Sequence, residues 1–480
     1  MRNVTLHVAA LAAAAALAAG TAAADPMAEQ LRQVAAKAGP SSVILSFSIA
    51  RDDGSRADIR APGTVVGDAN LVMFSSLAVP SQIPVEQFRD FQVLVARGTE
   101  IQSYAAEYLG KDDQAQVAFV RPTDPAAPAL PALAFDGQAA VEVGDPVVSF
   151  GSLGEPDAYA SVVQQARVSV RIERPFPVYL ALGGLGAVGT PVFTLDGKAF
   201  GIVGVHRLNR GTNAKPNWAN VEVVWPVARF AERLKNPPQG GLAVKRPWLG
   251  IEALTPVTKD MADYFKLGDR RGIVVGQVVE NGPASKAGLK AEDIILALNG
   301  KAIAGTEGQL VESFANDLRE MQVGQEAVLD VWRGGQAVTL KAVLEPQPKG
   351  PAEAERYHDT QFGLMVREMV LMDRLTRELP SDATGVVVAF LERAGWAQDS
   401  GLQVGDIVKK VQDQEVKTLA DFKKVFQAEV AKKPKEIVLF VQRGKKDTQV
   451  VRIEPRWDAA KKEPGPGPGD SENDAPEEAP

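Results

Sequence analysis

Short apolar runs separated by glycine, proline and aspartate dominate the chain between residues 41 and 227. Representative runs are residues 43–49, 71–74, 91–95, 116–120 and 146–150. Many short strands at regular spacing are typical of an all-β barrel or sandwich. A helical pattern over residues 27–38 precedes them. The pattern therefore predicts a mainly β amino-terminal domain that follows a short helix.

The most informative stretch of this domain is residues 183–205, GGLGAVGTPVFTLDGKAFGIVGV. A glycine-rich loop is followed by an apolar run, the pair Asp196-Gly197 and a second apolar run. This pair between alternating hydrophobic residues indicates a hairpin, because both residues tolerate the positive φ of a tight primed turn. We expect two paired strands with the glycine loop at their entrance.

The carboxyl-terminal half contains an internal repeat. Gly272, Gly282, Gly288 and Asp293 recur as Gly385, Gly395, Gly401 and Asp406, and the sequence distance between the two members is the same for all four pairs. This constant distance, the repeat offset, predicts two tandem copies of one module. The copies are expected at residues 248–346 and 357–456, with linkers at 237–247 and 347–356.

The two ends of the chain differ from the rest. Residues 1–24 combine Arg2, a short apolar core and an Ala22-Ala23-Ala24 cleavage site, which predicts a secretory signal peptide. Residues 457–480 are acidic and lack the apolar residues needed for a core, which predicts a disordered tail. The mature amino-terminal domain is then residues 25–236, in a periplasmic or secreted location.

Composition excludes several classes of function. The 480 residues carry a net charge of −7, so no basic field attracts nucleic acid. The chain has no cysteine, which rules out disulfides and thiolate chemistry. We expect no cofactor and no metal, because the mature chain has only His206 and His358, in different domains.

Three segments of the amino-terminal domain resemble the HtrA/DegP family of trypsin-like proteases. Gly186-Ala-Val-Gly-Thr-Pro191 is similar to that family's nucleophile loop G-N-S-G-G-P. Residues 70–79 and 109–120 resemble the strands that carry the catalytic histidine and aspartate. The resemblance implies a chymotrypsin-like double β-barrel, in which Leu77, Gln116 and Val188 occupy the catalytic positions.

None of these three side chains can act as nucleophile or base. Loss of the nucleophile alone costs about 10⁶ in turnover in a related triad. We therefore predict that the chain is not an enzyme, that Gly186 belongs to a residual oxyanion loop, and that Leu77 and Val188 pack into a closed cleft.

Relocated chemistry remains an alternative. Ser75, Ser76 and Thr190 are the hydroxyls nearest to the altered positions in the sequence, and a hydroxyl–lysine pair stays open. The alternative prediction is therefore that the chain is an active serine endopeptidase with relocated catalytic groups.

The two repeated modules resemble the PDZ domains that follow HtrA barrels. Residues 281–300 are similar to the module's run N-x-P-A-x-x-A-G-L-x-x-G-D-x-I-x-x-x-N-G, with Glu292 in place of a glycine. The resemblance implies α+β modules that bind a peptide by strand addition, with its terminal carboxylate at backbone N–H groups. The implied peptide-binding residues are Arg246, Trp248, Leu249, Gly250 and Ile251 in the first copy and Phe362, Gly363 and Leu364 in the second.

The second copy departs further from the pattern, so its groove is predicted either to bind peptide or to be architectural. As a whole, the resemblance implies a binder of carboxyl-terminal or unfolded peptides of envelope proteins. It would serve as a chaperone, an adaptor or a protease-regulating subunit, as a trimer or with an active relative. A scaffold unrelated to proteolysis is a further alternative.

Overall fold

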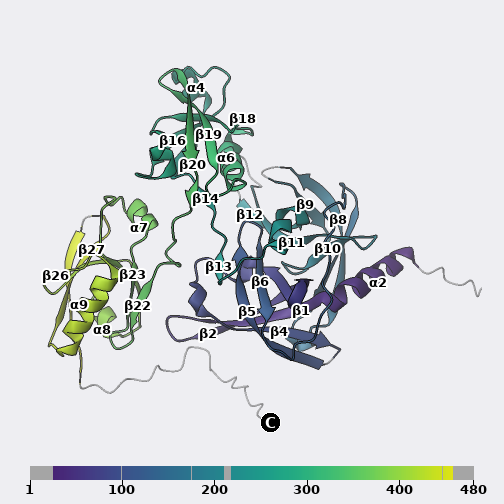
Figure 1. Ribbon diagram of the computed structural model, residues 1–480, viewed down its shortest axis with the longest axis horizontal. Coiled ribbons are helices and arrows are strands. Elements are labelled where there is room, and N and C mark those ends of the chain that lie inside the picture. Colours follow the sequence, from purple (N-terminus) through teal and green to yellow (C-terminus); the bar gives the residue numbers. More distant parts are fainter. Residues whose placement is uncertain (1–24, 99, 174–175, 210–217, 446, 458–480) are drawn as a thin grey trace, which may run out of the picture. The chain divides into compact units, whose positions relative to one another are not determined.

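The computed structural model describes residues 25–98, 100–173, 176–209, 218–445 and 447–457. The predicted signal peptide (1–24) and nearly all of the predicted acidic tail (457–480) lie outside these residues. The chain divides into two compact units at residues 348 and 349 (Figure 1). Within the described residues, no helix is long and apolar enough to cross a membrane.

The predicted amino-terminal helix is α2 (Pro26–Ala38). Asp25 caps it by accepting a hydrogen bond from the Met27 amide at 3.0 Å, which satisfies one of the free N–H groups of the first turn. Val34 and Ala38 of α2 are buried in a cluster with Phe150 and Phe193 of the second barrel. The helix is therefore part of the core, and not a free extension.

The first barrel consists of six antiparallel strands that close through a pairing of β5 with β6. In chain order the strands are β1 (Ser42–Ala50), β2 (Arg56–Gly67), β3 (Leu71–Ser75), β4 (Phe88–Arg97), β5 (Glu100–Asp112) and β6 (Val117–Pro122). Short 3₁₀ turns connect them: η1 (Gly39–Ser41), η2 (Asp68–Asn70), η3 (Ser76–Ala78) and η4 (Val85–Gln87). Alternate residues of β1, such as Leu45 and Phe47, fill the core.

The second barrel closes in the order β10-β11-β12-β9-β8-β7. Its strands are β7 (Pro146–Ser152), β8 (Ser161–Ile172), β9 (Val178–Leu182), β10 (Pro191–Thr194), β11 (Ala199–Asn209) and β12 (Trp218–Pro226). The turns η5 (Glu155–Asp157) and η6 (Val227–Arg229) and the helix α3 (Ala231–Lys235) complete it. Two closed barrels confirm the predicted double-barrel fold.

The predicted hairpin forms between β10 and β11, but its turn differs in type. Gly197 has a φ of +78°, whereas Asp196 has no positive φ. The Gly197 amide donates to the Thr194 carbonyl at 2.9 Å, and the strand register shifts by one residue beyond it. The connection is therefore longer than a two-residue primed turn, because only its glycine takes the left-handed conformation.

The first carboxyl-terminal module is a sheet in the order β15-β16-β17-β19-β20, with β18 on β17. Its strands are β15 (Ile251–Pro256), β16 (Ile273–Val278), β17 (Ile294–Leu298), β18 (Lys301–Ala302), β19 (Glu326–Arg333) and β20 (Gln336–Val343). Two short strands at the ends of the module, β14 (Pro247–Trp248) and β21 (Glu345–Pro346), pair with each other. The preceding strand β13 (Leu242–Ala243) pairs with β5 of the first barrel. The module's helical elements are α4 (Lys259–Tyr264), α5 (Pro283–Lys286), η7 (Glu307–Gln309) and α6 (Leu310–Arg319).

The second module repeats this arrangement and adds one strand. Its sheet runs β22-β23-β24-β25-β27-β28, with β26 on β25. The strands are β22 (Arg356–Asp359), β23 (Leu364–Glu368), β24 (Val386–Leu391), β25 (Ile407–Val411), β26 (Gln414–Glu415), β27 (Ile437–Arg443) and β28 (Asp447–Ile453), and the helices are α7 (Leu371–Thr376), α8 (Trp396–Asp399) and α9 (Leu419–Ala431). The additional strand, β22, precedes β23 at the edge of the sheet.

The same polar contact fixes both modules. Asp293 and Asp406 are both 1% exposed, and each accepts two hydrogen bonds from an arginine, Arg333 and Arg443 respectively. Each arginine also donates to a glycine carbonyl, that of Gly288 at 2.7 Å or Gly401 at 3.0 Å. The repeated aspartates of the sequence therefore have equivalent structural roles.

Candidate functional site

The glycine loop between β9 and β10 lies against the end of β3. A Cβ atom on Gly189 would lie 3.1 Å from the Ser75 amide nitrogen, so the close approach requires glycine there. The Gly189 amide donates to the Val203 carbonyl at 2.7 Å, and Thr190 Oγ1 donates to the Ala187 carbonyl at 2.8 Å. The fold thus brings the loop that contains Val188 next to the segment that contains Leu77.

The residues at the three predicted catalytic positions have different environments. Leu77, in η3, is 49% exposed, and Val188 is half-buried against the core of the second barrel. The Gln116 side chain bridges the barrels, because its Nε2 donates to the Val205 carbonyl at 2.6 Å and its Oε1 accepts from the Val205 amide at 2.9 Å. Gln116 therefore completes a backbone pairing with β11.

The prediction of a closed cleft packed by Leu77 and Val188 is wrong for Leu77. The turn η3 directs this side chain to solvent, where about half of its surface stays accessible. The hydrophobic character of a residue does not fix its burial when the local turn points it outward.

The three candidate hydroxyls are buried, and none of them contacts a base in the part of the chain that the structure describes. Ser76 is 1% exposed, and its Oγ has no hydrogen-bond partner among the described residues. Ser75 Oγ accepts from the Leu77 amide at 3.3 Å, and the Thr190 hydroxyl is used within its own loop. These positions do not come together as a nucleophile–base pair.

A hydroxyl–lysine contact does exist, at a position that the sequence analysis missed. Lys111 Nζ is 2.6 Å from Ser81 Oγ and 3.1 Å from Asp113 Oδ1, and Ser81 Oγ donates to Asp113 Oδ2 at 2.5 Å. Lys111 is 7% exposed and also donates to the Val79 carbonyl. Because Ser81 follows Leu77 by four residues, its nearness to an altered position was the available signal.

The two histidines belong to different compact units of the chain. His206 is half-buried in β11, its ring contacts Phe176 at 5.8 Å, and burial lowers its pKa. His358 is exposed in β22 of the second module. Among the described residues, no group of three or more metal-ligating side chains is close enough together to bind a metal ion.

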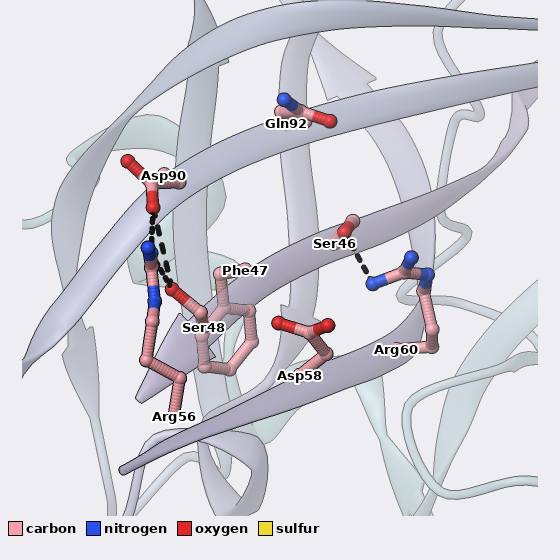
Figure 2. A pocket seen from close by; sticks show the side chains of 8 residues that line it. All are labelled: Ser46, Phe47, Ser48, Arg56, Asp58, Arg60, Asp90 and Gln92. Atoms are coloured by element: carbon pink, nitrogen blue, oxygen red, sulfur yellow. Dashed lines mark hydrogen bonds and ion pairs between the residues drawn. The ribbon is translucent and has the colours of Figure 1, made fainter. Parts of the chain in front are cut away.

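A polar pocket of about 370 Å³ lies on β1, β2 and β4 of the first barrel (Figure 2). Arg56 pairs with Asp90 and donates to Ser48 Oγ at 2.7 Å, while Arg60 donates to Ser46 Oγ at 2.6 Å. Both arginines therefore interact with residues of the pocket itself.

In the first module, β15 forms the edge of its sheet next to α6. The preceding loop contains Leu249, which is buried, and Gly250, which has a φ of +83°. Among the hydrogen bonds of the described residues, none uses the amides of Leu249 and Gly250, whereas their carbonyls accept from Ala284 and Val279. The loop presents N–H groups beside an open strand edge, with half-buried Arg246 four residues before Gly250.

In the second module, the equivalent loop has a partner from its own chain. Asp359 Oδ1 accepts hydrogen bonds from the amides of Gln361 and Phe362, each at 3.1 Å. Gly363 has a φ of +60°, and Phe362 and Leu364 are fully buried. The structure thus retains the loop geometry, but the Phe362 amide, which corresponds to that of Leu249 in the first module, already has an acceptor.

Comparison with known proteins supports the resemblance. Residues 248–344 match the family model described as "PDZ domain". The chain is 27% identical over 360 residues to a "Probable periplasmic serine endoprotease DegP-like" of Brucella suis. The matched region covers 73% of this chain and 66% of that protein's length. The chain is also 27% identical to the protein of that name in Rhizobium meliloti (78% of this chain, 72% of the relative) and to "Periplasmic serine endoprotease DegP" of Salmonella typhimurium (71% and 67%).

The solved structure of the HtrA-type protease AlgWS227A with a decapeptide shares the fold. The TM-score is 0.51 at 18% identity, over 68% of this chain and 99% of that one. The names of the sequence relatives agree with the predicted periplasmic or secreted location.

The prediction that the chain is not an enzyme is contradicted by these relatives, because each of them is named a serine endoprotease. The prediction rested only on the three replaced side chains, and the structure also places the Ser81 hydroxyl 2.6 Å from Lys111 Nζ. The chain is thus similar in sequence to the DegP-like periplasmic serine endoproteases, it shares the fold of an HtrA-type protease, and its residues 248–344 match a PDZ domain.

Proposed function

We propose that this chain acts on exported polypeptides in the periplasm, and that its first carboxyl-terminal module captures their free carboxyl ends. The observation that carries the proposal is the edge strand β15 beside a loop whose Leu249 and Gly250 amides have no acceptor among the described residues. An extended peptide can pair with such an edge while its terminal carboxylate accepts from the loop. Trp248 and Ile251 border the same loop, and Arg246 adds a positive charge nearby.

The test is a titration of the full chain with carboxyl-terminal peptides of unfolded envelope proteins, each also made as an amide. We expect the amidated peptides to bind at least tenfold more weakly, since they lack the charge that the loop amides solvate. Gly250→Glu should abolish binding, because a side chain at this φ of +83° is strained and lies 3.4 Å from Gly282 and Pro283.

Gly300→Glu is the matched control for that variant. Gly300 has a φ of +73° in the same module, but no atom lies within 4 Å of the Cβ that would be added. It imposes a similar backbone strain away from the loop. Equal binding by Gly250→Glu and Gly300→Glu, or equal affinity for acid and amide peptides, would refute the proposal.

A second candidate function is endopeptidase activity with relocated catalytic groups, which the names of the relatives favour. In this candidate Ser81 is the nucleophile and Lys111 the group that takes its proton, at 2.6 Å. Lys111 acts as a base only in its neutral form, and its Nζ also lies 3.1 Å from the Asp113 carboxylate.

A serine-directed fluorophosphonate probe tests this candidate together with cleavage of an unfolded protein. Labelling and cleavage that disappear in Ser81→Ala, but persist in Ser76→Ala and Thr190→Ala, would support it. Activity that depends on Ser76 or Thr190 would assign the chemistry to those hydroxyls instead. Absence of labelling at any pH would rule the candidate out.

We further propose that the second module is a PDZ domain and that the chain assembles through its barrels, as a trimer or with an active relative. In such an assembly the first module would deliver polypeptides to a barrel, in a chaperone or adaptor role. Measurement of the mass in solution tests the assembly, since a monomer at micromolar concentration would contradict it.

A further inference from the structure

We infer that the peptide groove of the second module is occupied by this chain's own strand β22, with the Asp359 carboxylate in place of a ligand's terminal carboxylate. An external peptide would then enter this groove only after β22 has left it. The inference rests on the proposed function in one respect, namely that the ligand competing with β22 is a peptide with a free carboxyl end.

The first observation is the pairing of the strand edge. β23 of the second module corresponds to β15 of the first, because Leu364 lies at the repeat offset from Ile251. β22 pairs with β23 in antiparallel register, from Arg356 opposite Arg367 to Asp359 opposite Leu364. The Glu368 amide extends this pairing by donating to the Glu355 carbonyl at 2.9 Å. The edge that receives a peptide by strand addition is therefore covered.

The second observation is the direction of β22. It runs toward the glycine loop at Phe362 and Gly363, which is the direction of a peptide whose terminal carboxylate is bound there. At the end of β22, Asp359 Oδ1 accepts from the Gln361 and Phe362 amides. Phe362 is the counterpart of Leu249 at the repeat offset, so a side-chain carboxylate binds one of the loop amides that we assign to a terminal carboxylate in the first module.

The third observation is the contact of β22 with α9. This helix contacts both β22 and β23, as α6 contacts β15 in the first module. The Tyr357 ring lies 6.1 Å from the ring of Phe422 in α9, and Lys423 Nζ lies 6.0 Å from the same tyrosine ring. The Tyr357 hydroxyl donates to Asp359 Oδ2 at 3.1 Å, so the anchoring side chain and the carboxylate support each other. β22 therefore contacts both β23 and α9, and its Tyr357 side chain makes the contact with the helix.

The charge at the corresponding position of the first module is opposite. Arg246 is the counterpart of Asp359 at the repeat offset, and the chain before it does not pair with β15. Instead, β13 pairs with β5 of the first barrel and β14 pairs with β21. The first module therefore has a cation where the second has the carboxylate of its own ligand.

Covalent attachment makes β22 a strong competitor. A segment joined to its groove by a short connection has an effective concentration of roughly millimolar. An external peptide of the same intrinsic affinity, supplied at about 10 μM, is then disfavoured by roughly a hundredfold.

The experiment uses the full chain with Gly250→Glu, which removes the first module as a binding site. The probe is a fluorescent synthetic peptide of residues 350–359, which ends at Asp359 with a free carboxylate. We expect no binding at 10 μM by the Gly250→Glu chain, and binding tightened at least thirtyfold when Tyr357→Ala and Asp359→Ala are added. His358→Ala is the matched control, because His358 is exposed on the same strand.

Amide hydrogen exchange of residues 364–368 provides a second readout that needs no ligand. Among them, the amides of Leu364, Val366 and Glu368 face β22; these should be protected in the wild-type chain and in His358→Ala, and exchange at least tenfold faster in Tyr357→Ala and in Asp359→Ala. If the double variant does not fold, the exchange rates of the two single variants still test the inference. Added probe should restore the protection.

Three results would overturn the inference. The first is equal binding of the probe with and without the β22 substitutions. The second is a folded double variant that binds no probe, and the third is fast exchange of the Leu364, Val366 and Glu368 amides in the wild-type chain. Failure of the first module to bind peptides would refute the proposed function, but it would leave this exchange result unchanged.

Discussion

The two carboxyl-terminal modules have the same architecture but differ in what covers the edge strand beside the glycine loop. β16, α5, β17 and β18 of the first module have β24, α8, β25 and β26 as counterparts in the second, and each pair begins at the repeat offset. Within the described residues no strand pairs with the outer edge of β15 in the first module, whereas β22 covers the edge of β23 in the second. Tandem copies can thus retain a fold while the segment that leads into each copy decides whether its groove is available.

The largest effect is expected for the arginine that holds the buried aspartate of each module. Arg333→Ala and Arg443→Ala each leave a carboxylate that is 1% exposed without its charge partner. We expect a loss of about 3 kcal/mol in the free energy of unfolding of the affected module. Denaturant unfolding followed by hydrogen exchange measures both modules in one chain.

Lys341→Ala is the control for that pair of variants. Its ion pair with Glu326 is exposed, with 65% and 48% of the side chains accessible, and should contribute less than about 1 kcal/mol. A large loss in one module and none in the other would break the structural equivalence of the two copies.

The second effect concerns the charge inversion between Arg246 and Asp359. Arg246→Asp should weaken peptide binding to the first module roughly 30-fold, about 2 kcal/mol, because attraction of the ligand's carboxylate becomes repulsion. Lys245→Asp changes the net charge equally at an exposed neighbouring position. Comparable weakening by both variants would show that only the overall field matters.

The third effect concerns equivalent positions that differ in their backbone freedom. Glu292 has a φ of +69°, and its counterpart Gly405 has a φ of +95°. Glu292→Gly should stabilise the first module by about 1 kcal/mol, because the left-handed conformation costs a residue with a Cβ about that much. Gly405→Glu should destabilise the second by a similar amount, measured by thermal unfolding. Opposite signs would contradict this account.

The smallest effect is a difference in acid stability. Asp373 of the second module is paired with Arg367 at 2.6 Å, whereas the equivalent positions of the first module are Asp260 and Leu254. Burial alone would raise the pKa of Asp373, but the Arg367 hydrogen bonds and the Val370 amide outweigh it and lower that pKa. The stabilisation is therefore complete above the unfolded pKa of about 3.9 and is lost as the pH falls through the lower folded value.

Exchange protection of the second module, compared with the first, should consequently fall more steeply below about pH 4. Asp373→Asn should remove most of that additional dependence. An unchanged acid response in this variant would assign the effect to other carboxylates.

The sequence alone determined the features that depend on local spacing. The β-rich amino-terminal domain, the hairpin around Asp196-Gly197, the helix before the first strand and the tandem repeat all follow from periodicity, turn residues or offsets that can be counted. These features are local, since a turn or an amphipathic strand is specified by a few neighbouring residues. The double barrel was implied by the resemblance to the HtrA/DegP family.

Only the tertiary structure decided which of several chemically suitable groups meet. Ser81 and Lys111 are 30 residues apart and come together because β5 returns beside the segment that follows β3, while Ser76 lies buried without a partner among the described residues. Leu77 is exposed because its turn directs it outward. The sequence does not show which segment will pair with a strand edge, because any nearby extended segment can form hydrogen bonds with its backbone. β22 pairs with β23 because the chain reverses direction between Asp359 and Leu364.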